Sequence, residues 1–222
     1  GNFRCPGTQQ GYSGYSTWTR GLSWAMLGFA EQLEFVRSYQ DIPQMEGLGG
    51  RDAIEEIFEK AARATCDFYI ENTALDGIPY WDTGAPGLAL MPDWRGSNSD
   101  PYNDFEPVDS SAAAIGAQGL LRLGSYLKEK GDAEFQKYWS AGLTVSQTLL
   151  QEPYLCQSKD HQGLILHSIY HRPMGWDNVP DNSKIPHSES SMWGDYHARE
   201  LMLYLQRVIN NDAYYTFFNH LV

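Results

Sequence analysis

The arrangement of charged residues along the chain limits its fold more than any other feature. Five segments place apolar residues at steps of three and four, and none sustains the alternation of a β-strand. Segments 16–39 and 110–127 carry few charges, and 191–208 begins with Trp and Tyr as the first segment does, whereas 51–71 and 132–151 are amphipathic. A helix that is apolar on most sides is buried, and an amphipathic one faces water. The order is therefore interior, exterior, interior, exterior, interior.

This alternation predicts an all-α protein built as a double ring of helical hairpins, with the interior helices around a central cavity. Five helices cannot close such a ring. We therefore expect residues 1–222 to form the C-terminal part of a single domain, whose remainder comes from an upstream segment. The N-terminus lacks an initiator Met and the pattern of a signal peptide, which agrees with this expectation.

Composition excludes several classes of partner. The formal net charge is −12 and no basic stripe is visible, which argues against nucleic acid. A run of about 18 apolar residues is absent, so we expect no membrane partner. The cysteines Cys5, Cys66 and Cys156 show no metal-binding or disulfide spacing, and no Asn-x-Ser/Thr pattern occurs. These features predict a cytoplasmic protein.

Aromatic residues make up 14% of the chain, which favours thick helix packing or a pocket that stacks on sugar rings.

Arg20 is the main candidate binding residue, because it is one of only two charges between residues 17 and 33. On a helix, Arg20 and Trp24 lie within about 40° of each other. A guanidinium can grip a carboxylate with two hydrogen bonds, a Trp ring can stack on a sugar, and Gln10 can bond a hydroxyl. The alternative is that Arg20 pairs with a buried Asp or Glu and that Trp24 belongs to the core.

Two aspartates have competing interpretations. Asp82 lies in DGIPYWDTGAP (76–86), where Gly and Pro mark turns and where Tyr80 and Trp81 are expected at the mouth of the ring; a turn-stabilising role for Asp82 is favoured over pocket lining. Asp109 directly precedes a helix of small residues and is predicted to be its N-cap. Asp109 is also a weak catalytic candidate, since an N-cap at the inner end of a ring helix lies near the cavity.

His167 and His171 have the i, i+4 spacing that can bind zinc on a helix, but Pro173 follows closely and no third ligand is placed by the sequence. We therefore predict no metal site and expect these histidines to line a loop. No phosphate-binding loop, nucleophile elbow or catalytic-cysteine pattern occurs. Hydrolysis by carboxylates is the main enzymatic option, and it requires no cofactor.

Five stretches taken in order resemble the landmarks of the unsaturated glucuronyl hydrolases, glycoside hydrolase family 88. They are QGYSGYSTWTRGLSWAMLGFAE, DGIPYWDTGAP, DSSAAAIGAQGLLRL, GLILHSIYHRP and WGDYHARELMLYLQR. The resemblance covers about the C-terminal three-fifths of a family member. It implies an (α/α)6 toroid, incomplete in this chain, and hydrolysis of 4,5-unsaturated uronyl residues at the non-reducing end of lyase-generated oligosaccharides.

The resemblance also implies roles for single residues. Gln10, Arg20 and Trp24 match positions that contact the unsaturated sugar, with Arg20 near its carboxylate, and Trp18 joins them as a candidate substrate-binding residue. The two catalytic aspartates are expected upstream of Gly1. In the implied reaction an aspartic acid protonates C4 of the vinyl ether and water adds at C5.

The chain departs from the family pattern at Gly14, Tyr15 and Leu22, and it has a long insertion around MPDWRGSNSDPYNDFEP. These departures leave the exact sugar and linkage open. The alternatives are a glycosidase or unsaturated rhamnogalacturonyl hydrolase that acts on another uronide, or a non-catalytic sugar-binding fragment. Ser188, Ser190 and Ser191 lie in a loop that either faces a second sugar or is simply solvated, and the latter is favoured.

Overall fold

The computed structural model describes residues 5–38 and 43–218, and its regular structure is helical. Within these residues β-pairing is limited to isolated bridges, so the predicted all-α class is confirmed. Each predicted segment matches one α-helix, with ends that differ by at most three residues. The helices are α1 (Thr19–Ser38), η1 (Pro43–Leu48), α2 (Gly50–Glu71), η2 (Pro86–Leu90), α3 (Ser110–Lys130), α4 (Phe135–Leu149), η3 (Arg172–Met174) and α5 (Met192–Ile209).

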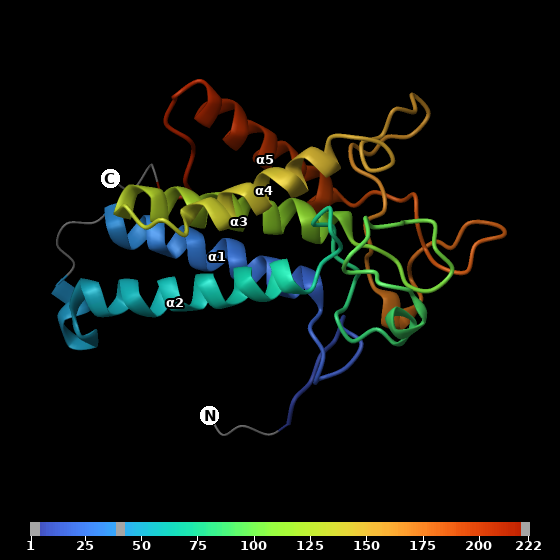
Figure 1. Cartoon of the computed structure of the whole chain (residues 1–222), viewed down its shortest axis with the longest axis horizontal. Coiled ribbons are helices and arrows are strands. Elements are labelled where there is room, and N and C mark those ends of the chain that lie inside the picture. Colours follow the sequence, from blue (N-terminus) through green and yellow to red (C-terminus); the bar gives the residue numbers. More distant parts are fainter. Residues whose placement is uncertain (1–4, 39–42, 219–222) are drawn as a thin grey trace.

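Helix α3 is the centre of the molecule. It packs against α1, α4 and α5 and more lightly against α2, and Figure 1 shows it between α1 and α4. Every residue from Ser110 to Gly124 is buried, which confirms the predicted interior position. The sequence permits this burial because the helix consists mostly of Ala, Gly, Leu and Ser, and its single central charge, Arg122, is paired within the protein. Small side chains allow neighbouring helices to approach closely.

The contact between α1 and α3 depends on glycine. A Cβ atom at Gly119 would lie 2.8 Å from the backbone nitrogen of Leu27 and 2.8 Å from the carbonyl carbon of Met26. A Cβ at Gly116 would lie 3.0 Å from the ring of Tyr69 and 3.1 Å from the hydroxyl of Ser23. Glycine is therefore required where the backbones of α1 and α3 meet.

Helices α2 and α4 lie outside this central contact, as their amphipathic patterns predict. The guanidinium of Arg63 on α2 contacts Glu59 at 2.9 Å and Asp132, before α4, at 2.5 Å. Lys137 on α4 contacts Asp67 on α2 at 2.7 Å. Exposed pairs of this kind add little stability each, so the apolar faces beneath them hold the hairpins together.

Helix α1 differs from the prediction on one side. Its most buried residues are Met26, Ala30 and Leu33. The expectation of burial all round is wrong, because Trp24 is 41% exposed. The reason is that α1 packs mainly against α2 and α3, which leaves its third side partly open in the part of the chain described.

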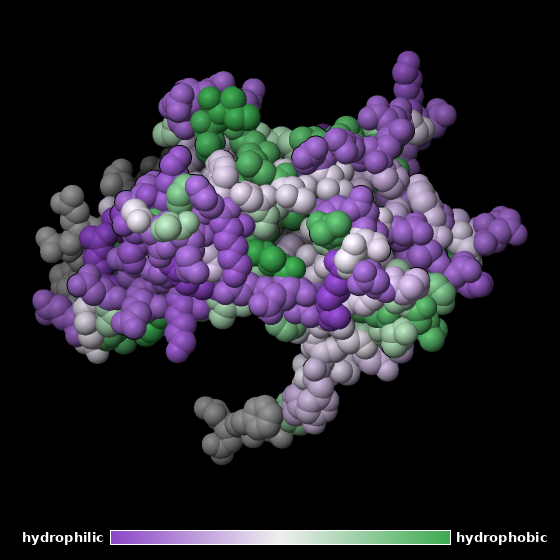
Figure 2. All heavy atoms as spheres, in the orientation of Figure 1, coloured by the Kyte–Doolittle hydropathy of each residue, from purple (hydrophilic) through white to green (hydrophobic). Residues whose placement is uncertain are grey.

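Helix α5 also exposes apolar surface. Leu203 and Ile209 are 41% and 76% exposed, and Figure 2 shows apolar side chains in green over the end of α5 at the top of the view. Polar residues in purple cover much of the rest of that face. No helix among the described residues is long and apolar enough to cross a bilayer.

The connections between hairpins gather at one end of the helices, on the right of Figure 1. Helices α1, α3 and α5 begin at this end, and α2 and α4 end there. A bridge between Asp82 and Trp18 holds the loop 72–109 against the residue directly before α1, and a bridge between Tyr80 and Val108 joins two parts of the loop. The first turns of three helices therefore share one loop-covered end, where the positive ends of their helix dipoles favour anionic groups.

Candidate functional site

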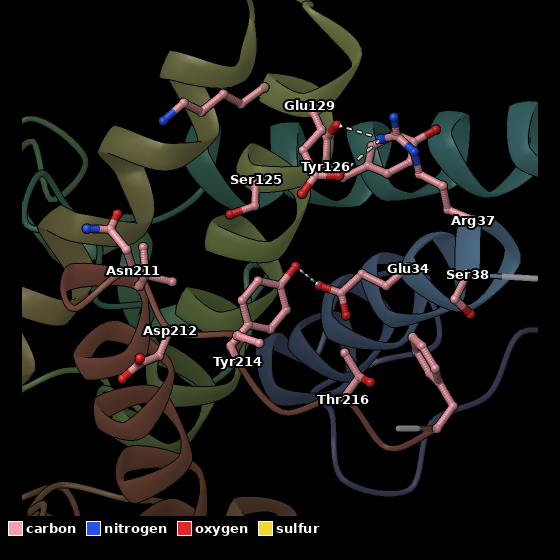
Figure 3. A pocket seen from close by; sticks show the side chains of 14 residues that line it. Glu34, Arg37, Ser38, Ser125, Tyr126, Glu129, Asn211, Asp212, Tyr214 and Thr216 are labelled. Carbon is pink, nitrogen blue, oxygen red and sulfur yellow. Dashed lines mark hydrogen bonds and ion pairs between the residues drawn. The ribbon is translucent and has the colours of Figure 1, made fainter. Parts of the chain in front are cut away.

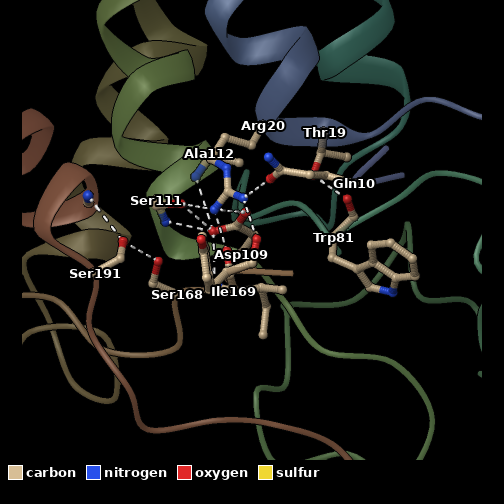
Figure 4. A network of polar contacts seen from close by, with 12 residues as sticks. Gln10, Thr19, Arg20, Trp81, Asp109, Ser111, Ala112, Ser168, Ile169 and Ser191 are labelled. Carbon is tan, nitrogen blue, oxygen red and sulfur yellow. Dashed lines mark hydrogen bonds and ion pairs between the residues drawn. The ribbon is translucent and has the colours of Figure 1, made fainter. Parts of the chain in front are cut away.

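Arg20 lies at this loop-covered end and is the centre of a polar network (Figure 4). Its side chain is buried and forms an ion pair with Asp109, with 3.6 Å between Nη1 and Oδ2. Nη1 also donates to the carbonyl oxygen of Ile169, and Nη2 donates to the carbonyl of Tyr170 at 2.8 Å and to Gln10 Oε1 at 2.8 Å. Arg20 thus joins the loop before α1, the start of α3 and the segment 169–170.

Two indole rings enclose the same guanidinium. Its carbon lies 5.0 Å from the ring centre of Trp18 and 4.8 Å from that of Trp193. Such cation–π contacts contribute about 0.5–2 kcal/mol each. Trp193 is held in turn by a 3.1 Å hydrogen bond from its indole nitrogen to the hydroxyl of Ser111. The structure therefore shows Arg20 in a buried pair with an aspartate, which is the alternative that the sequence left open. Contact between Arg20 and a ligand carboxylate stays a prediction.

Asp109 is the N-cap of α3, as predicted. Its Oδ1 accepts hydrogen bonds from the backbone nitrogen of Ser111 at 3.0 Å, from the Ser111 hydroxyl at 2.5 Å and from the nitrogen of Ala112 at 3.3 Å. Its Oδ2 faces Arg20 and has no hydrogen-bond partner within residues 5–38 and 43–218. Both oxygens are thus committed to holding the start of α3 and the guanidinium, which are structural roles.

Gln10 is oriented by Arg20. A guanidinium has only donors, so the amide oxygen of Gln10 must face it and accept. The amide nitrogen is then the atom that Gln10 can offer to a ligand, as a donor to a sugar hydroxyl or carboxylate. The predicted role of Gln10 in binding a sugar is compatible with this orientation.

Trp24 is separated from the Arg20 network. Its ring contacts His197 of α5, edge to face, with 4.9 Å between ring centres. The Nδ1 atom of His197 lies 3.2 Å from Glu200 Oε2 and 3.0 Å from the amide nitrogen of Gln118. The hydrogen bond with Glu200 is the main cause of the lowered pKa of that carboxyl. A partly exposed indole supported by a buried histidine provides a flat surface on which a sugar ring can stack.

The segment 76–86 is structural. Tyr80 and Trp81, expected at the mouth of the ring, are 2% and 4% exposed and belong to the core, which corrects that expectation. Asp82 has the predicted turn-stabilising role. Its Oδ1 accepts a hydrogen bond from the backbone nitrogen of Gly84 at 2.9 Å, and its Oδ2 accepts one from the backbone nitrogen of Tyr12 at 2.8 Å. The aromatic residues are buried because two bridges hold this segment against the residues that precede α1 and α3.

His167 and His171 lie in loop structure between α4 and α5, as expected, and not on an α-helix. The ring of His167 is neutral and fixed: Nδ1 accepts from the nitrogen of Ser188 at 3.1 Å, so Nε2 carries the proton and donates to the carbonyl of Pro153 at 3.2 Å. In the described part of the chain, no three metal-binding side chains come together. His167 therefore holds the loop that contains Ser188.

The buried His167 predicts loss of stability in mild acid. Desolvation lowers the pKa of His167 from 6.5 to about 4, so its stabilising effect is complete above pH 6.5 and is lost as the pH falls towards 4. Between pH 7 and pH 5 we expect this residue to reduce the free energy of unfolding by about 2 kcal/mol. Urea denaturation at both pH values measures the change, and the His167→Gln variant should lose that part of the pH dependence. An equal loss in both proteins would contradict this assignment.

A cavity of about 870 Å³ lies at the opposite end of the helices, between α1, α3 and the segment 211–218 (Figure 3). Glu34, which lines the cavity, contacts Arg122 at 2.7 Å and accepts from the hydroxyl of Tyr214 at 3.0 Å. Burial raises the pKa of Glu34 to about 7, against the opposing effects of Arg122 and Tyr214. We assign this cavity no ligand.

Sequence reasoning missed two parts of the Arg20 network. Trp193 was not among the candidates, although a Trp in the first turn of a predicted interior helix is a signal for a residue near the loop-covered end. The carbonyl groups of Ile169 and Tyr170 carry no such signal, because any residue can supply a backbone oxygen.

No family model matches the chain. Among curated proteins it is 30% identical over 215 residues to the unsaturated glucuronyl hydrolase of Bacillus sp. (strain GL1), an alignment that covers 96% of this chain and 46% of that protein. It is 29% identical over 204 residues to the unsaturated glucuronyl hydrolase of Formosa agariphila, covering 91% and 40%. The chain therefore spans less than half the length of these relatives.

Solved structures of unsaturated glucuronyl hydrolases also resemble the chain. The crystal structure of the unsaturated glucuronyl hydrolase from Bacillus sp. GL1 aligns with a TM-score of 0.63 and 28% identity, over 95% of this chain and 45% of that one. An unsaturated glucuronyl hydrolase specific for heparin aligns with a TM-score of 0.63 and 23% identity, over 94% and 44%. The fold predicted through the resemblance is confirmed. The chain is similar in sequence to unsaturated glucuronyl hydrolases over less than half of their length and shares the helical fold of that part.

Proposed function

We propose that the protein to which this chain belongs is a glycoside hydrolase that acts on 4,5-unsaturated uronyl residues at the non-reducing end of oligosaccharides. The observation that carries this proposal is the 30% identity to an unsaturated glucuronyl hydrolase across 96% of the chain. Further relatives are named unsaturated chondroitin disaccharide hydrolases, such as that of Streptococcus agalactiae, 24% identical over 198 residues.

The geometry of the loop-covered end supports an anionic sugar ligand. The N-terminal ends of α1, α3 and α5 meet at this end, and the positive ends of their helix dipoles favour a carboxylate in a protein with a net charge of −12. Trp24 offers a partly exposed ring for stacking, and Gln10 offers amide hydrogens. Arg20 contributes by fixing Gln10 and the loops around it.

The proposed reaction begins with protonation of C4 of the vinyl ether by a carboxylic acid. Positive charge develops at C5 and the ring oxygen, water adds at C5, and the resulting hemiketal rearranges and releases the rest of the oligosaccharide. The acid must remain protonated near neutral pH, which requires a raised pKa. In the described residues Asp109 is committed to the N-cap and Arg20, so we propose that the acid lies outside this chain.

The test is loss of the ultraviolet absorbance of the enol ether when the full-length protein is mixed with an unsaturated uronyl disaccharide. We expect the Trp24→Ala variant to raise KM about tenfold, because stacking on an indole contributes about 1 kcal/mol or more. Ile57→Ala, on the exposed side of α2, is the control and should leave KM unchanged. Unchanged absorbance with the full-length protein would reject the proposed function. Equal KM values in wild type and Trp24→Ala would reject only the role of Trp24.

A further inference from the structure

Three aromatic rings form a continuous surface beside the Arg20 network, which we call the aromatic shelf: Trp193, Tyr170 and Trp176. The ring centres of Trp193 and Tyr170 are 5.5 Å apart, and those of Tyr170 and Trp176 are 5.6 Å apart at an angle of 35°. Tyr170 is 48% exposed and Trp176 is 57% exposed. Because Trp193 also contacts Arg20, the shelf leads outward from the loop-covered end.

The shelf is held in place before any ligand arrives. The carbonyl of Tyr170 accepts from Arg20 at 2.8 Å, and both oxygens of Asp177 accept from the backbone, from Tyr170 at 2.5 Å and from His171 at 3.1 Å. The His171 ring packs against Trp176 with 4.9 Å between centres. Rigid rings that are exposed in advance bind a ligand without a further loss of conformational entropy.

The shelf carries an unpartnered buried atom as well. His171 is 5% exposed, and its Nδ1 has no hydrogen-bond partner among the residues that the structure describes. A polar atom left unpaired under exposed aromatic rings is suited to a ligand that combines apolar faces with hydroxyl groups. Pyranose rings have this combination.

The charges around the shelf are unfavourable to an anion. The carboxylate of Asp177 lies directly beneath the shelf backbone, and Glu189 is held by Asn178 at 3.4 Å. Lys184, the lysine of the same loop, is paired with Asp104 at 2.8 Å. Arg172 is the one remaining arginine or lysine in residues 164–193, so carboxylates outnumber the cations available there.

We propose that the aromatic shelf binds a neutral pyranose and disfavours a sulfated one. Resting on the proposed function, this pyranose is the sugar linked to the unsaturated uronyl residue. The uronate then occupies the region of Trp24 and Gln10, and the next ring stacks across Tyr170 and Trp176.

Binding of a neutral probe tests the shelf without any catalysis. Titration of the purified chain with methyl cellobioside, followed by calorimetry or by NMR of the ligand, should give saturable binding. Trp176→Ala should weaken it at least tenfold, and a 6-O-sulfated form of the probe should bind at least tenfold more weakly to the wild type. Tyr215→Ala, also an exposed aromatic but at the opposite end of the helices, is the matched control and should bind normally. Absence of binding, or equal binding by Trp176→Ala, would overturn the proposal.

A second measurement connects the shelf to the reaction. In the full-length protein, Trp176→Ala should raise KM about tenfold for an unsaturated uronyl disaccharide with a neutral hexose. KM should change less than twofold for the methyl glycoside of the same uronyl residue, which has no second ring. Equal effects on both substrates would exclude the shelf as the site of the second sugar. Failure to hydrolyse either substrate would reject the proposed function, while the probe titration would still decide whether the shelf binds a pyranose.

Discussion

Replacement of Arg20 by Gln is expected to lower the free energy of unfolding by about 3–5 kcal/mol, because it leaves the buried carboxylate of Asp109 without its cation. The carbonyls of Ile169 and Tyr170 lose their donors at the same time. Urea denaturation of the purified variant measures the change. A residue that served only to bind a ligand would leave the unliganded protein as stable as the wild type.

Two variants separate the buried pair from a general effect of removing an arginine. Arg51→Gln disrupts a partly exposed contact of 4.0 Å with Glu55 and a 2.8 Å hydrogen bond to the carbonyl of Arg37, and it should change stability by about 1 kcal/mol. The double variant Arg20→Gln, Asp109→Asn removes both charges, and it should be more stable than Arg20→Gln alone. If the double variant is less stable by the full sum of the single changes, the two side chains do not interact.

Replacement of Gly119 by Ala should destabilise the protein by about 3 kcal/mol, because the added methyl would overlap the backbone of α1 at Met26 and Leu27. Backbone atoms cannot rotate away as a side chain can, so α1 and α3 must separate. Thermal denaturation should show a melting temperature several degrees lower.

Gly28 provides the matched control for this substitution. It also lies in a helix, but a Cβ atom at Gly28 meets nothing within 4 Å. Gly28→Ala should therefore stabilise the protein by up to about 1 kcal/mol, the difference in helix propensity between the two residues. A loss of stability in both variants would show that close approach of α1 and α3 is not the cause.

The helices and the cap of α3 could be predicted from sequence because they depend on neighbours along the chain. Periodicity located all five α-helices, and the position of Asp109 before a run of small residues identified the N-cap. The turn role of Asp82 followed from the surrounding Gly and Pro residues. Each of these features depends on residues that are only a few positions apart in the sequence.

The partners of Arg20 could not be predicted, because they come from segments distant in sequence. Asp109 is 89 positions away, and Ile169 lies 149 positions away and contributes only its backbone. Burial of Tyr80 and Trp81 depends likewise on bridges that involve the residues before α1 and α3. The open side of Trp24 was missed because composition shows how apolar a helix is, but not which neighbours surround it.

The arrangement of the helices has a consequence for how such a protein can diverge. Because the long connections leave and enter at the same end, insertions there can reshape what the protein recognises while the packed glycine-rich contact below stays intact. Homologues with different sugar preferences should therefore differ in loop length at that end far more than in the spacing of α1 from α3.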